Sequence, residues 1–221
     1  MTAWRWCAVF AFVMLGISVS FGQIQNIDAC GPGPAGEPIL SLEFVTNPDQ
    51  VASLFLEHCK SALAQAHNKG VWIDILGFVP AYLLTLITAL VALAKDADNQ
   101  GRWIALLGFV AAIIAAICDQ VENVQLLRIV DALPGTQDMI TLLMPAVRAK
   151  FALLGVSVSC IGTLIYLGTG WLRYVGLVML AGGLVSILGL FLDPALVMGG
   201  GVVAWPLILL TAVTKSFSRP D

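Results

Sequence analysis

Long apolar runs separated by short polar stretches form the main pattern of this chain. A helix needs about 20 mostly apolar residues to cross the hydrocarbon core of a bilayer, and five runs come close to that length. We therefore predict an all-α fold, a polytopic transmembrane helical bundle of five or six spans with one amphipathic extramembrane helix. The runs cover residues 71–93, 103–118, 151–167, 171–192 and 195–213, so that the bundle occupies 71–213.

The composition supports a membrane protein and argues against other classes. Hydrophobic residues make up 59% of the 221 residues and charged residues 11%, whereas soluble domains contain about 25% charged residues. The formal net charge of −3 is spread over short connections without a tract of Lys or Arg, so we expect no nucleic-acid partner. The partner that this composition predicts is the lipid bilayer.

Residues 1–22 allow two interpretations. Arg5 precedes an apolar stretch that is followed by small residues, as in a secretory signal peptide cleaved before Phe21 or Gln23. The same stretch could instead be retained as a short first transmembrane span. Both interpretations place residues 23–70, the outer segment, on the outer side of the membrane.

The distribution of basic residues predicts the orientation of the spans. Cytoplasmic loops of membrane proteins carry an excess of Lys and Arg, counted over short loops near the ends of the spans. With the N-terminus inside, six basic residues fall in short inner segments and five in the two long outer segments, 23–70 and 119–150. We therefore predict a multi-pass protein with a cytoplasmic N-terminus and a cytoplasmic tail at 214–221.

The outer segment is predicted to contain an irregular connector followed by one helix. Residues 30–38 are rich in Gly and Pro, which hold neither a helix nor a paired strand. Asn47 is a suitable N-cap, Pro48 suits the first helical position, and apolar residues then recur at helical spacing. We predict an amphipathic helix over 48–67, ended by residues 68–70, that lies at the outer interface or over the mouth of the bundle.

Two cysteines of the outer segment are candidates for a disulfide bond. Cys30 and Cys59 fall where an oxidising compartment would allow the bond. The alternative is two unpaired thiols, with Cys59 packed on the apolar face of the helix, because a disulfide forms only where the two Cα atoms lie close together. His58 and His67 are nine residues apart and turn to opposite helix faces, so we predict no metal site, and we expect no cofactor.

Polar groups inside the bundle are predicted to gather at its outer end. Asp74 lies in a stripe of small and polar residues in the run 71–93, and Asp119 and Glu122 continue a second stripe in the next run. Small residues mark helix faces turned toward neighbours, and antiparallel spans bring these carboxylates to one level. The resulting candidate polar cluster comprises Asp74, Tyr82, Asp119, Glu122 and Asn123.

The cluster has a functional and a structural interpretation. Clustered carboxylates could hold a cation, relay a proton or take part in acid–base chemistry. Alternatively, they form a network at the ends of the helices with Arg128, Arg148 or Lys150, which satisfies their charge.

Three features, in this order, resemble a group of uncharacterised bacterial multi-pass membrane proteins. They are Leu42-Glu43-Phe44 before the outer helix, Asp74 followed by Tyr82, and the sequence Asp119-Gln120-Val121-Glu122-Asn123. In that group, an Asp…Tyr span is followed by a span that ends in Asp-x-x-Glu-Asn. The resemblance covers about residues 40–130 and implies a location in the bacterial inner membrane, but it implies no activity.

Two functional hypotheses follow. The first is a non-catalytic binding, accessory or assembly component, whose partner would be another membrane protein. The second is a membrane-embedded enzyme or small transporter that uses the polar cluster. The sequence shows no nucleophile motif, no His-Glu-x-x-His and no phosphate loop, and no internal repeat typical of transporters. We therefore favour the first hypothesis, which a closed salt-bridge cluster would support.

Overall fold

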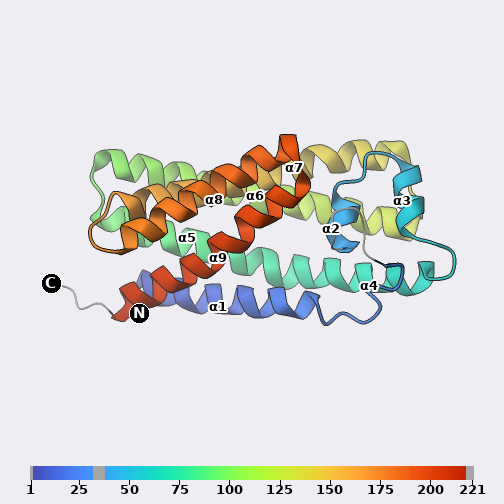
Figure 1. Cartoon of the computed structure of the whole chain (residues 1–221), viewed down its shortest axis with the longest axis horizontal. Coiled ribbons are helices and arrows are strands. Elements are labelled where there is room, and N and C mark those ends of the chain that lie inside the picture. The colour runs from blue at the N-terminus through green and yellow to red at the C-terminus, as the bar shows by residue number, and fades with distance from the viewer. Residues whose placement is uncertain (1, 32–37, 218–221) are drawn as a thin grey trace. The chain divides into compact units, whose positions relative to one another are not determined.

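The protein is built from helices. The computed structural model describes residues 2–31 and 38–217 (Figure 1). Helices form all of the regular secondary structure in these residues. The predicted all-α fold class is therefore confirmed.

Within the described residues, six helical segments are long and apolar enough to cross a bilayer. Five of them contain the apolar runs predicted from the sequence, and the sixth covers the stretch with two interpretations near the N-terminus. The chain is thus a multi-pass membrane protein whose apolar helices contact the lipid bilayer. The segments are α1 (Ala3–Phe21), α4 to α5 (Lys60–Asp96), α6 (Asn99–Asp131), α7 (Gln137–Tyr166), α8 (Leu172–Leu192) and α9 (Pro194–Phe217).

Three of these segments are longer than a bilayer requires. The segments α4 to α5, α6 and α7 contain 37, 33 and 30 residues. At 1.5 Å per residue, α6 is about 50 Å long, whereas the hydrocarbon core is about 30 Å thick. Their apolar runs cover only part of each segment, which leaves polar extensions at 60–70, 119–131 and 137–150. We infer that these extensions lie at or beyond the membrane surface.

The chain divides into two compact units. Unit 1 contains the described parts of 1–16, 80–116 and 151–221, and unit 2 contains the described parts of 17–79 and 117–150. All three polar extensions belong to unit 2.

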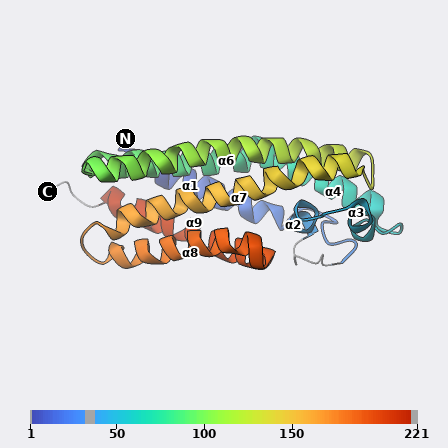
Figure 2. The ribbon, with the colours of Figure 1, turned by 90° about the horizontal axis from the view of Figure 1, so that it is seen from above.

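The helices of unit 1 pack through small residues. Figure 2 shows α7 turning into α8 through a short loop, and α8 packs along α9. A Cβ atom added to Gly162 would lie 2.5 Å from the backbone nitrogen of Leu180, and one added to Gly183 would lie 2.6 Å from the Gly155 carbonyl oxygen. Gly200 of α9 likewise lies against the backbone of α8. The helices therefore touch backbone to backbone, as small residues at membrane helix interfaces allow.

Unit 2 contains two short helices, α2 (Pro38–Glu43) and α3 (Pro48–Leu54). The start of α3 is the predicted one, because the Asn47 side chain accepts a hydrogen bond from the Gln50 backbone nitrogen at 2.9 Å. The Gln50 side chain in turn accepts one from the Thr46 backbone nitrogen at 2.6 Å. Helix α4 (Lys60–Ile73), the π-helix η1 (Asp74–Phe78) and helix α5 (Val79–Asp96) follow one another along the chain.

The prediction of one helix over 48–67 is wrong. The helix ends after Leu54, because Phe55 leaves helical geometry with φ −102° and ψ 69°. Its ring is buried and packs edge-on against the ring of His67, with the centroids 5.2 Å apart. The chain becomes helical again at Lys60, directly after the disulfide-bonded Cys59.

The predicted helix end at residues 68–70 is also wrong. Helix α4 passes through Gly70 and is followed without a break by η1. Gly70 is buried, and one glycine lowers helix stability by only about 1 kcal/mol. The boundary at residues 70 and 71 is therefore not a structural break, because α4 runs across it.

Candidate functional site

A buried lysine on α7 forms ion pairs with three carboxylates in unit 2. The Lys150 ammonium lies 2.7 Å from Glu122 Oε1, 3.0 Å from Glu43 Oε2 and 3.5 Å from Asp119 Oδ1. All four residues are buried, with exposed fractions of 8% or less. Buried charges are costly unless they are paired with good geometry, and Lys150 supplies that pairing.

Each carboxylate reaches Lys150 from a definite place in the fold. Asp119 and Glu122 are three residues apart on α6 and share one helix face, as predicted. Glu43 is the last residue of α2, and its neighbours Leu42 and Val45 are buried and anchor this short helix. The ion pairs therefore join α2, α6 and α7.

Asp74 occupies a fourth position, bound by an amide rather than by the lysine. The Asn123 amide nitrogen of α6 donates a hydrogen bond to Asp74 Oδ2 at 2.6 Å. Asp74 also interacts electrostatically with Asp119, Lys150 and Glu43. We call this set of six residues the Lys150 cluster: Glu43, Asp74, Asp119, Glu122, Asn123 and Lys150.

The backbone at Asp74 is unusual, because the π-helix begins there. A π-helix replaces i to i+4 hydrogen bonds by i to i+5 bonds, and it occurs frequently at functional sites. The Gln120 amide nitrogen of α6 donates a hydrogen bond at 3.2 Å to the Ile75 carbonyl oxygen inside this segment. Gln120 and Asn123 thus hold both the backbone and the side chain of the π-segment.

The cluster contains more acidic than basic groups. Four carboxylates face one ammonium ion, and Glu122 Oε2 is buried without a hydrogen-bond partner among the described residues. No group of three or more His, Cys, Asp or Glu side chains in the described part of the chain is arranged to hold a metal ion. The geometry is therefore that of an ion-pair network centred on Lys150.

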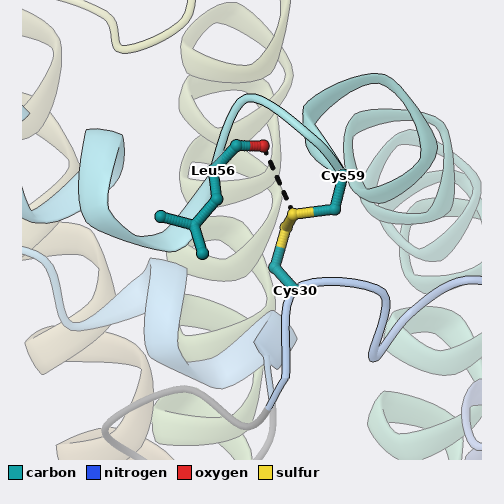
Figure 3. The surroundings of a disulfide bond; sticks show 3 residues. All are labelled: Cys30, Leu56 and Cys59. Atoms are coloured by element: carbon teal, nitrogen blue, oxygen red, sulfur yellow. Dashed lines mark hydrogen bonds between the residues drawn. A yellow bond between two sulfur atoms is a disulfide. The ribbon is translucent and has the colours of Figure 1, made fainter.

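A disulfide bond lies in the same unit. Cys30 and Cys59 are bonded, with their Cα atoms 5.5 Å apart (Figure 3). Cys59 Sγ also lies 3.3 Å from the Leu56 carbonyl oxygen, the contact that is dashed in Figure 3. Of the two alternatives left by the sequence, the structure has the bridge and not the two thiols.

The structure separates Tyr82 from the other predicted site residues by assigning it to unit 1. There its buried ring lies 6.1 Å from the ring of Trp205. Asp74, Asp119, Glu122 and Asn123 all lie in unit 2 and belong to the Lys150 cluster.

Two residues of the cluster were not among the predicted site residues. Glu43 appeared only in the resemblance, and Lys150 appeared only as one of three basic residues that could neutralise the carboxylates. A local signal exists for both, because Glu43 stands between Leu42 and Phe44, and Lys150 directly precedes an apolar run. A charged residue inside apolar sequence indicates a buried, paired group.

Comparisons with known proteins identify no relative of this chain. No family model matches the chain, and no curated protein or solved structure matches it. The resemblance of residues 40–130 to bacterial membrane proteins stays a prediction.

Proposed function

We propose that this protein is a non-catalytic integral membrane component with a binding, accessory or assembly role. The observation that carries the proposal is the closed contact of Lys150 with Glu43, Asp119 and Glu122. Buried groups that contact one another in ion pairs are suited to holding a fold together, whereas catalysis needs a group that can meet a substrate.

The part that these ion pairs hold is the cap segment, which we define as residues 38–59 with α2 and α3. Glu43 of the cap segment pairs with Lys150. The Thr46 carbonyl oxygen of the cap segment accepts a hydrogen bond from the Gln137 side-chain nitrogen at 3.2 Å. The disulfide at Cys59 fixes its far end. A segment held this firmly against α6 and α7 offers a defined surface to another membrane protein.

We further propose that the cap segment faces the outer side of a bacterial inner membrane. Disulfides persist in oxidising compartments, so the Cys30–Cys59 bond supports an outer location. The bacterial location rests on the resemblance alone. Single cysteine probes should react with a membrane-impermeant reagent at Gln25 and Gln137 but not at Asn99. Reaction of the probe at Asn99 alone, in intact cells, would show that the orientation is the opposite of the proposed one.

The alternative, a small transporter, is favoured by one observation, the surplus of carboxylates in the cluster. Reconstituted protein and empty liposomes should be compared under an imposed proton gradient, with a pH-sensitive dye inside. A non-catalytic component dissipates the gradient no faster than empty liposomes do. Faster dissipation by the wild type that is abolished in Asp119→Asn would refute the proposal and make the cluster a transport site.

A further inference from the structure

The Lys150 cluster carries an unbalanced formal charge. Glu43, Asp119 and Glu122 contact the ammonium, and Asp74 interacts with it electrostatically from its bond to Asn123. These are the charged groups that α2, η1, α6 and α7 direct at one another. If every carboxylate were ionised, a single ammonium would leave a surplus of negative charge in a site shielded from water, which is strongly unfavourable.

Two ways of reducing the surplus are a bound metal ion and a bound proton. The described residues contain no group of three or more acidic, His or Cys side chains arranged for a metal. A proton needs only one carboxylate oxygen that is not already in use. Glu122 Oε2 meets this requirement, because it is buried in a residue that is 1% exposed and has no hydrogen-bond partner among the described residues.

We propose that the Lys150 cluster binds an exchangeable proton that is shared among Asp74, Asp119 and Glu122. Interacting acids release protons as a group, so the proton belongs to the cluster rather than to one residue. Asp74 is the half-buried carboxylate of the set, whereas Glu43, Asp119 and Glu122 are buried. The proton therefore exchanges with the surroundings through Asp74, at the start of the π-helix.

Infrared spectroscopy of the full-length protein in detergent tests this proposal directly. A protonated carboxyl group has a C=O stretching band that an ionised carboxylate lacks. The wild type should show this band at neutral pH, with an intensity of about one group per chain because the cluster binds one shared proton, and the band should shift in heavy water and vanish as the pH is raised.

Three variants assign the band. Glu122→Gln and Asp74→Asn should each remove or shift it, because each takes a sharing oxygen out of the cluster. Asp138→Asn changes an exposed carboxylate on α7 and should leave the band unchanged.

The outcomes that overturn the proposal are equally definite. A wild-type spectrum without the band at neutral pH refutes it, and so does a band that persists unchanged in both cluster variants. If Glu122→Gln does not fold, Asp74→Asn decides, since it replaces a half-buried carboxylate by an amide of the same shape. Proton binding does not require transport, so this result is independent of the liposome experiment.

Discussion

The helices inside unit 1 and those inside unit 2 are held by different kinds of contact. In unit 1, α7, α8 and α9 meet through glycine and serine at backbone distance. In unit 2, three ion pairs to Lys150, amide hydrogen bonds and a disulfide make the equivalent connections. Every ion pair found among the described residues lies in unit 2.

We infer that the difference in packing follows from the surroundings of each unit. Burial gains little between helices surrounded by lipid tails, which are as apolar as the side chains, so close backbone packing must supply the attraction. We infer that the polar extensions of α4, α6 and α7 lie at or beyond the membrane surface, where charged groups can be buried against one another. The protein therefore uses two packing modes, and each mode predicts which substitutions lower its stability.

The largest effect is expected from Lys150→Met in unit 2. The substitution leaves Glu43, Asp119 and Glu122 buried without their cation, and breaking a buried pair in this way costs about 3–5 kcal/mol. The free energy of unfolding can be measured by titrating the detergent-solubilised protein with SDS. Arg148→Met, an exposed residue on the same helix, is the matched control and should have little effect. Equal losses in the two variants would show that the ion pairs do not hold unit 2.

The second effect concerns the disulfide of the same unit. Cys30→Ser should lower the free energy of unfolding by about 3 kcal/mol, because the bond closes a loop with a sequence separation of 29. The variant should also expose the cap segment to protease. Cys118→Ser, at a free cysteine, serves as the control. A Cys30→Ser protein as stable and as protease-resistant as the control would mean that the bond is dispensable.

The third effect tests the packing of unit 1. Gly162→Ala would place a methyl group 2.5 Å from the Leu180 backbone nitrogen, and such overpacking costs about 2 kcal/mol. Gly199→Ala adds the same group to open space on α9 and should raise the stability by about 0.5 kcal/mol or more. Thermal unfolding of both variants gives the comparison. A loss of stability in Gly162→Ala together with a gain in Gly199→Ala supports backbone contact between the helices. A Gly162→Ala protein as stable as the wild type contradicts it.

The smallest effect is expected at the π-helix. Gln120→Leu removes the hydrogen bond to the Ile75 carbonyl oxygen and should cost about 1 kcal/mol. Hydrogen exchange of the backbone amides at 74–78 should quicken in the variant, while exchange at 84–90 of α5 stays as it was. Unchanged exchange at 74–78 would show that the π-segment does not depend on α6.

The sequence predicted the membrane spans well, because an apolar run of the length of a bilayer is a local property. The convergence of Asp74, Asp119 and Glu122 also followed from helix periodicity and antiparallel order. The interruption of the outer helix did not, because it depends on the burial of Phe55 and the bond at Cys59. The pairing of Lys150 with Glu43 could not be predicted either, since the two residues lie 107 positions apart and local patterns carry no information on such contacts.

The disulfide has a consequence for the ion pair formed by Glu43. It closes a covalent ring from Cys30 to Cys59, and Glu43 lies on this ring. A tethered group meets its partner at an effective concentration set by the length of the tether, so the ring keeps the Glu43 carboxylate near the Lys150 ammonium even when the ion pair opens. Reduction of the bond would lower that concentration, and the ion pair would then weaken without any change to the residues that form it.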